Sequence, residues 1–201
     1  FGSLTLEECI YPRDKSLNFG EFNNCKIICD DYQLSTLLEL SKNPENLSSY
    51  EKVLTELFPS SEILTVACHS AVNYHLYSLV YNSQKIRFKK VVSGEPLVEY
   101  GDRIEEEEKI YNYSKIINGQ RLFRSTYKND EVYDNTEDQM MEDFTFGIAA
   151  RHLGVMISMN GDEKLMFETE FRKYTNSNSK KDNENIDSVK LKKSWLSRLF
   201  K

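Results

Sequence analysis

Short apolar segments alternate irregularly with segments of helical periodicity, and this mixture constrains the fold more than any other feature of the sequence. The most strand-like segment is Ile63–Cys68, which we expect to be a central strand buried on both faces. A hairpin is expected next, with Tyr74–Tyr81 and Ile86–Val92 flanking a polar four-residue turn at 82–85. Because strands and helices follow no βαβ rhythm, the sequence predicts an α+β fold, with a mostly antiparallel sheet packed by helices.

The second arm of this hairpin alternates between apolar and basic side chains. Ile86 and Phe88 alternate with Arg87 and Lys89, a pattern that favours a strand with one face in solvent. The acidic run Glu105–Glu108 is also interpreted as a solvated face, because it lacks the alternating pattern of a calcium loop.

Two short helices are predicted before residue 60. Ser35 is the expected N-cap of the first, which stops before Pro44. The second begins with the Ser-x-x-Glu spacing of a capping box, from Ser48 to Glu51, and runs to Pro59.

Three further elements complete the expected domain. Cys25–Cys29 is predicted to be a strand that follows a turn at 23–24. A longer helix is expected over 136–153, with acids at its start and Gly154 at its end. The alternating segment 164–172 is expected to be the last strand.

The chain is long enough for one hydrophobic core, and its composition changes after residue 174. With 201 residues, 39% of them hydrophobic and 29% charged, it falls in the range of globular domains. The segment 175–184 consists mainly of Asn, Ser, Lys and Asp, which offer no apolar surface to bury. We therefore expect a globular domain over 1–174, a flexible polar linker over 175–185 and a basic amphipathic helix over 186–201.

The net charge of −6 hides an asymmetry. Residues 172–201 carry nine basic and three acidic side chains, a net +6, which leaves −12 for the rest of the chain. An acidic body repels phosphate backbones, so the charge argues against nucleic-acid binding by the folded domain. Such a role ranks third among the functions considered and would rest on the C-terminal segment alone.

The cysteines and the apolar segments bear on the compartment. Four cysteines occur, at 9, 25, 29 and 68; two disulfides are arithmetically allowed, but their apolar surroundings favour buried free thiols in a reducing compartment. We found no apolar run long enough to span a bilayer. The expected location is cytoplasmic, and the C-terminal segment is the part of the chain that could make a peripheral contact with the inner membrane surface.

The C-terminal segment has the pattern of a cationic amphipathic helix. At about 100° per residue, an apolar half faces a basic half. It carries the only Trp of the chain, as is typical of helices that lie on an anionic membrane surface or in a partner's groove. Docking onto its own domain, or no role at all, are the alternatives. The residues expected to make the contact are Leu191, Lys192, Lys193, Trp195, Leu196, Arg198, Leu199 and Phe200.

Candidate catalytic residues lie at the end of the Ile63–Cys68 segment. Cys68, His69 and Ser70 place two nucleophilic side chains beside a histidine, the minimum for acyl transfer, and Asp30 is the candidate orienting acid. Successive strand residues point to opposite faces, however, and no Gly-x-Ser-x-Gly elbow frames Ser70. The competing interpretation is a partly buried histidine, hydrogen-bonded at a strand end.

No metal or cofactor site is expected. Cys25 and Cys29 have the wrong spacing for a zinc knuckle, and the chain has three histidines in total. The glycines do not form a phosphate-cradling pattern.

Several short motifs together resemble a bacterial family, domain of unknown function 6928. The likeness covers roughly residues 6–100 and rests on Tyr11-Pro12, on Gly20 to Asp30, on the strand that ends in His69-Ser70, on the hairpin, and on Gly94-Glu95-Pro96-Leu97. Family members begin with an extra N-terminal strand that this chain lacks, and the basic C-terminal segment is not part of the pattern. The family has no established activity, so the resemblance marks Cys29, Asp30, His69 and Ser70 for testing and transfers no mechanism.

These observations favour a non-enzymatic protein-binding or adaptor module with an unidentified protein partner. Its C-terminal helix would dock on a membrane surface or on the partner. The alternative is a small hydrolase that uses His69 with Ser70 or Cys68.

Overall fold

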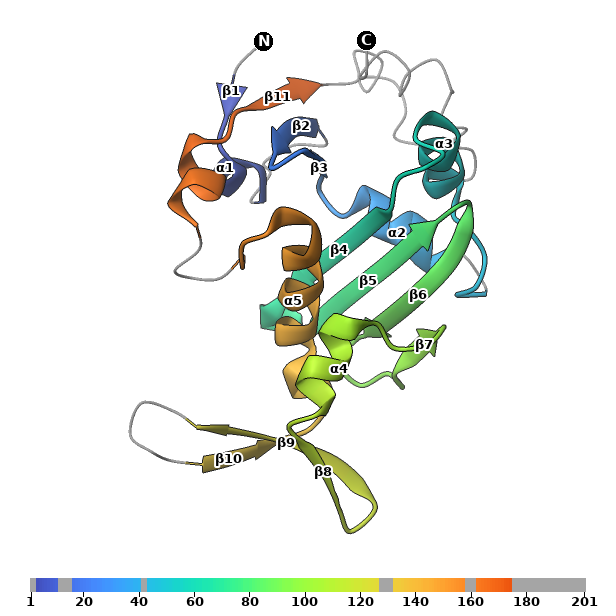
Figure 1. The fold of residues 1–201 in the computed structure, drawn as a ribbon, viewed down its shortest axis with the longest axis vertical. Coiled ribbons are helices and arrows are strands. Elements are labelled where there is room, and N and C mark those ends of the chain that lie inside the picture. Colours follow the sequence, from blue (N-terminus) through green and yellow to red (C-terminus); the bar gives the residue numbers. More distant parts are fainter. Residues whose placement is uncertain (1–2, 11–15, 41–42, 127–131, 158–161, 175–201) are drawn as a thin grey trace.

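The computed structural model describes residues 3–10, 16–40, 43–126, 132–157 and 162–174. The predicted linker (175–185) and amphipathic helix (186–201) lie outside the described residues. Within them, helices combine with sheets whose strand pairs are all antiparallel, which confirms the predicted α+β class (Figure 1).

The central sheet has four strands in the order β4-β5-β6-β7. They are β4 (Ile63–His69), β5 (Tyr74–Tyr81), β6 (Gln84–Val91) and β7 (Val98–Tyr100). The prediction that Ile63–Cys68 is a central strand was wrong, because β4 lies at the edge and β5 lies inside the sheet. The apolar composition of β4 has another cause: Ile63 and Ala67 pack under helices on one face, and Leu64 packs under helices on the other.

Three hairpins use two-residue turns in which both turn residues have positive φ. They join β2 to β3 (Asn23-Asn24), β5 to β6 (Asn82-Ser83) and β8 to β9 (Asn118-Gly119). Such turns match the right-handed twist of the flanking strands, and Asn and Gly tolerate positive φ best. The β5–β6 hairpin was predicted, but its turn has two residues rather than four.

A bulge in β6 decides which of its basic residues face which layer. The register shifts so that Leu79 pairs with Arg87 and Val80 pairs with Lys85, which leaves Ile86 as an extra residue. One extra residue reverses the alternation of side chains. Lys85 therefore shares a face with Val80, and Arg87 points to the opposite face.

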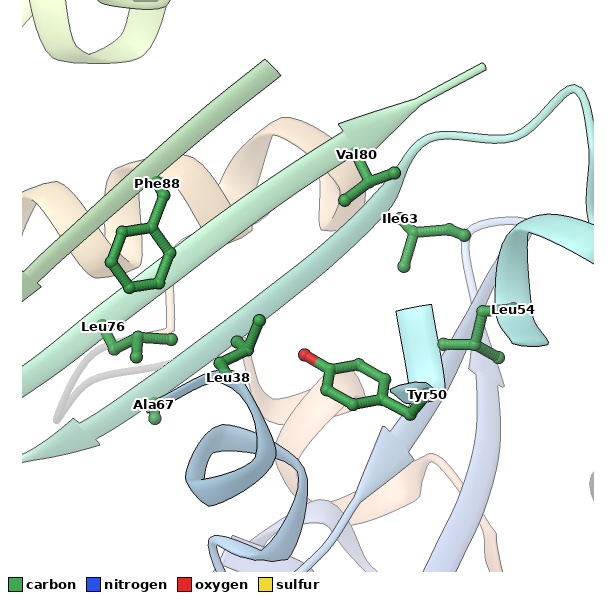
Figure 2. Packing of buried hydrophobic residues seen from close by; sticks show 8 residues of the cluster. All are labelled: Leu38, Tyr50, Leu54, Ile63, Ala67, Leu76, Val80 and Phe88. Carbon is green, nitrogen blue, oxygen red and sulfur yellow. The ribbon is translucent and has the colours of Figure 1, made fainter. Parts of the chain in front are cut away.

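Helices α2 (Gln33–Glu39) and α3 (Ser49–Leu57) cover one face of the central sheet. Figure 2 shows Leu38, Tyr50 and Leu54 from these helices beside apolar side chains of β4, β5 and β6. The capping box from Ser48 to Glu51 is confirmed. The expected cap at Ser35 was wrong: Ser35 lies inside α2, and the carboxylate of Asp30 accepts a hydrogen bond from the backbone N–H of Leu34, 2.7 Å.

Helices α4 (Glu105–Tyr111) and α5 (Met141–Leu153) cover the opposite face. Tyr111, Phe144 and Ile148 pack there against Tyr77 of β5. A 3₁₀ turn (Asp138–Met140) leads into α5, and Gly154 ends the helix, so the predicted helix is confirmed with a later start.

A second sheet lies at the upper end of the molecule in the view of Figure 1. Its strands run in the order β1-β11-β2-β3. They are β1 (Ser3–Leu4), β2 (Leu17–Phe22), β3 (Cys25–Cys29) and β11 (Phe171–Tyr174). Helix α1 (Leu6–Ile10) and the end of α5 pack against it. The ring of Phe171 lies over Gly20, where a Cβ atom would come within 2.7 Å of the ring.

The segment predicted as a last strand is only partly a strand. Residues Lys164–Glu168 form a π-helical turn, and strand pairing begins at Phe171. Leu165 is fully buried against α1. Burial of a helical turn, rather than strand geometry, therefore explains part of the apolar pattern of this segment. The four cysteines are free thiols.

A third sheet, which we call the arm, projects away from the body (Figure 1). Its strands run in the order β10-β9-β8, with β8 at Ser114–Ile117, β9 at Gln120–Thr126 and β10 at Val132–Asn135. Phe123 anchors the arm under α5. No helix among the described residues is long and apolar enough to cross a membrane.

Candidate functional site

Three basic side chains of β6 are buried, each against a glutamate from a covering element. Lys85 donates to Glu51 of α3, 2.5 Å, and to Ser78 of β5, 2.7 Å. Glu51 also accepts hydrogen bonds from Ser78, 2.6 Å, and from the backbone N–H of Ser48, 2.7 Å. This glutamate therefore caps α3 and neutralises a buried lysine with the same carboxylate.

The second buried cation, Arg87, lies on the opposite face beneath α4. Its guanidinium donates to Glu107 from Nε, 2.9 Å, and from Nη2, 2.7 Å. It also donates to Glu99, 2.6 Å, and to the carbonyl of Gly101, 2.7 Å. Burial on its own would lower the pKa of Arg87, but the bonds to Glu107 and Glu99 outweigh it and raise the pKa.

These contacts correct two predictions. The face of β6 that carries Arg87 and Lys89 is fully buried, not solvated. Glu107, inside the acidic run 105–108, is 0% exposed and also accepts a bond from the hydroxyl of Tyr77, 2.7 Å. Burial of a cation is tolerated here because a carboxylate lies within hydrogen-bond reach.

The third cation, Lys89, is held between aromatic rings and a carboxylate. Its ammonium lies 4.1 Å from the ring centroid of Phe144 and donates to the hydroxyl of Tyr111, 2.8 Å. It also donates to Oε1 of Glu137, 2.6 Å, which accepts a short bond from Tyr111 as well. Burial alone would raise the pKa of Glu137, but these donors lower it overall, so its carboxylate is ionised at neutral pH.

A cleft of about 500 Å³ opens where the central sheet, the loop before β7 and the arm meet. The floor includes Val91 at the end of β6. The rest of the lining comes from the segment before β5, the loop after β6, the β8–β9 turn with the start of β9, and the segment before α5: Asn73, Val92, Ser93, Gly94, Glu95, Leu97, Gly119, Gln120, Arg121, Thr136, Glu137 and Asp138. Its volume is in the range of small-molecule sites.

Of the residues that the sequence marks as catalytic, the structure brings Ser70 and Cys68 into contact but links neither of them to His69. The hydroxyl of Ser70 donates to Glu142 of α5, 2.9 Å, and lies 3.5 Å from the Cys68 sulfur. His69 is exposed, and its ring stacks on Tyr32 at a centroid distance of 6.0 Å. Among the described residues, His69 forms no hydrogen bond to Ser70, Cys68 or Asp30.

Asp30 and Cys68 have environments that differ from those of an activated pair. The carboxylate of Asp30 is engaged at the start of α2, and burial raises its pKa. Burial also raises the pKa of the Cys68 thiol, with a further contribution from the charge of Glu142. A raised pKa reduces the fraction of the reactive thiolate. The hydrolase alternative stays an untested prediction.

The histidine that faces Cys68 is His75, its direct partner across β4 and β5. His75 is 3% exposed, and its Nδ1 atom has no hydrogen-bond partner among the described residues. Burial lowers the pKa of its imidazole. Among the described residues, no group of three or more acidic, cysteine or histidine side chains is placed to hold a metal ion.

Sequence reasoning did not single out the charged residues of the cleft. The sequence predicts Glu137 and Asp138 only as acids at a helix start, and Arg121 follows the Asn118-Gly119 turn in an irregular stretch without a motif. The sequence does hold a signal in β6: its four basic residues, Lys85, Arg87, Lys89 and Lys90, require acids from other elements if the strand is buried.

Comparison with known proteins adds no relative. No protein-family model, curated protein or solved structure matches the chain. The resemblance to domain of unknown function 6928 therefore remains a prediction.

Proposed function

We propose that the chain is a non-enzymatic protein-binding module that captures an extended segment of a partner protein on the free edge of β8. The observation that carries the proposal is the arm. Among the described residues, β8 has a strand neighbour on one side, β9, and its other edge is unpaired. An unpaired strand edge presents backbone donors and acceptors to any added strand.

Side chains along this edge supply apolar contacts. Ile116 is 66% exposed and Tyr113, just before the strand, is 77% exposed; Ile117 is exposed as well. In strand addition, main-chain hydrogen bonds give affinity and alternate side chains give specificity. Lys115 lies between Tyr113 and Ile116 in the sequence. It limits pairing of this edge with the same edge of a second copy of the chain, because the two Lys115 side chains would then repel each other.

Charge favours a partner segment that carries acidic residues. The two strands at this edge, β8 and β9, carry three basic side chains, Lys115, Arg121 and Arg124, and no acid. The chain as a whole is acidic, so the β8–β9 hairpin is a local basic feature. An apolar strand flanked by acids would be attracted to the arm and repelled by the rest of the surface.

A displayed library of random linear peptides, selected against the full chain, tests this function. We expect enriched peptides to combine apolar alternation with flanking acids, and their synthetic forms to lose binding in Ile116→Pro, which removes a backbone donor from the edge. Val132→Pro on the other edge strand, β10, is the matched control. Enrichment that is indifferent to Ile116→Pro, or no enrichment, would count against the function.

The C-terminal segment adds a second contact in this account, an adaptor's attachment to an anionic membrane surface. Its basic and apolar halves are the support for this part of the proposal. It implies a cytoplasmic protein that is peripheral at the inner membrane surface. Co-sedimentation of the full chain with phosphatidylserine-containing vesicles should weaken with salt and with Lys192, Lys193 and Arg198 changed to Gln. Binding that persists in that variant would exclude these three basic residues as the membrane contact, and no binding by either form would leave a partner's groove as the site.

A further inference from the structure

The cleft holds opposite charges that do not pair with each other. Arg121, at the arm, and Asp138, before α5, both line the same cleft of about 500 Å³. Among the described residues, neither forms an ion pair with any residue. Arg121 donates to the hydroxyl of Ser114, 2.7 Å, and Asp138 accepts from the hydroxyl of Thr136, 2.5 Å. The printed hydrogen-bond partner of each is thus a neutral hydroxyl group.

Glu137 adds an acceptor whose position is fixed from behind. Its Oε1 atom takes the bonds from Lys89 and Tyr111, and Lys89 is fully buried. Its Oε2 atom accepts no hydrogen bond from the described residues, although the residue lines the cleft. A carboxylate held by buried donors loses little conformational freedom when it accepts one more bond, so it is preorganised for a ligand.

The position of Arg121 is fixed as well. Its guanidinium lies 5.4 Å from the ring centroid of Tyr111, the same ring that supports Glu137. The bond to Ser114 uses Nη1, which leaves the remaining N–H donors of the fork for another acceptor. A guanidinium fork matches a carboxylate in geometry and charge.

The other cleft residues leave room between these groups. Gly94 and Gly119 have no side chain, and even an added Cβ atom at either position would meet no atom within 4 Å. Glu95, the remaining acid of the lining, is paired with Lys90, 3.5 Å. Of the charged groups in the lining, Arg121 and Asp138 therefore form no ion pair among the described residues, and Glu137 keeps one carboxylate oxygen, Oε2, without a hydrogen bond from them.

We propose that this cleft binds a small zwitterionic ligand, a compound with one carboxylate and one primary ammonium group. Arg121 binds the carboxylate. The Oε2 atom of Glu137 and the carboxylate of Asp138 accept hydrogen bonds from the ammonium group. A primary ammonium fits better than a guanidinium here, because Oε1 of Glu137 is occupied and the acceptors are single oxygens of two carboxylates rather than one bidentate carboxylate. This site does not include the free edge of β8, although Arg121 also contributes to the basic charge beside that edge, and it goes beyond the proposed function.

The test uses the full chain and a series of ω-amino acids: glycine, β-alanine, 4-aminobutyrate and 6-aminohexanoate. Binding is followed by NMR, with the backbone amides of Gly94 and Gly119 as reporters inside the cleft. One chain length should bind best, and it should bind more tightly than n-butylamine or butyrate, each of which satisfies one side of the cleft. Equal shifts with the single-charge compounds, or no shift of either glycine amide with any member, would overturn the proposal.

Three variants locate the contacts. Arg121→Gln and Asp138→Asn should each weaken the best zwitterion by about tenfold or more, since each removes a hydrogen bond to a charged group. Arg124→Gln is the matched control on the same strand; its ion pair with Asp134 is exposed, and binding should be unchanged. If Arg121→Gln perturbs the structure of the arm, Asp138→Asn, which lies outside the arm, still tests the contact with the ammonium group. Binding that is unaffected by both cleft variants would also overturn the proposal.

Discussion

The buried pair of Arg87 and Glu107 allows the sharpest test of how the core is held together. Changing Glu107 to Gln keeps the size of the side chain and removes its charge. The variant leaves Arg87 buried, with Glu99 as its remaining carboxylate. Removing one partner of a buried ion pair typically costs about 3 to 5 kcal/mol. Because Glu99 and backbone carbonyls still contact Arg87, we expect the lower end of that range, about 3 kcal/mol.

Urea unfolding followed by circular dichroism measures this loss. With a slope of about 2 kcal/mol per molar urea, a loss of about 3 kcal/mol lowers the unfolding midpoint by about 1.5 M. Glu99→Gln is the matched control, because Glu99 contacts the same guanidinium but its side chain is 42% exposed. Exposed partners contribute about 1 kcal/mol or less. Equal midpoints for the two variants would refute the account of β6 as a buried ion-pair strand.

Three other predictions concern single positions. Burial lowers the pKa of His75 in the folded state. The stability that His75 contributes is therefore complete above its unfolded pKa of about 6.5 and is lost as the pH falls below that value. The urea midpoint should thus fall less between pH 7.5 and 5.5 in His75→Gln than in the unchanged chain, and an equal fall in both would contradict this. Cys68 should react more slowly with iodoacetamide at pH 7.5 than a free cysteine does, because burial raises its pKa; a rate at or above that of free cysteine would show an activated thiol instead. Gly94→Ala should cost about 1 to 2 kcal/mol for its positive φ alone, whereas Gly101→Ala should lower the urea midpoint much more, because its Cβ atom would lie 2.0 Å from a carbonyl oxygen of β6; equal losses would exclude that clash.

Local sequence signals predicted local structure well. The β5–β6 hairpin, the capping box at Ser48 and Glu51, and the end of α5 at Gly154 each depend on neighbours within a few residues, and all three are confirmed. The fold class followed from the order of these elements.

Layering could not be predicted from the same signals. The alternation of Arg87 and Lys89 with apolar residues fits a solvated face as well as a face covered by helices that bring acids. The covering acids, Glu107 and Glu137, are 20 and 48 residues away in sequence. The edge position of β4 could not be predicted for the same reason, because an edge strand that is covered by helices on both faces is as apolar as a central strand.

The candidate site shows a similar limit. Adjacency in sequence suggested that His69 and Ser70 act together, yet Ser70 contacts Glu142, 72 residues away, and His69 stacks on Tyr32. The charges of the cleft come from the arm and from the segment before α5, which no local motif connects. Tertiary structure alone brings Arg121 near Asp138.

Amide hydrogen exchange of β8 in the full chain, with and without the strongest selected peptide, tests the central claim of a strand-capturing arm most directly. Added strand pairing should protect amides on the free edge of residues 114–117, at alternate positions, while β10 changes little. Protection confined to the cleft or spread over the central sheet, with β8 unchanged, would contradict the claim and place the partner elsewhere.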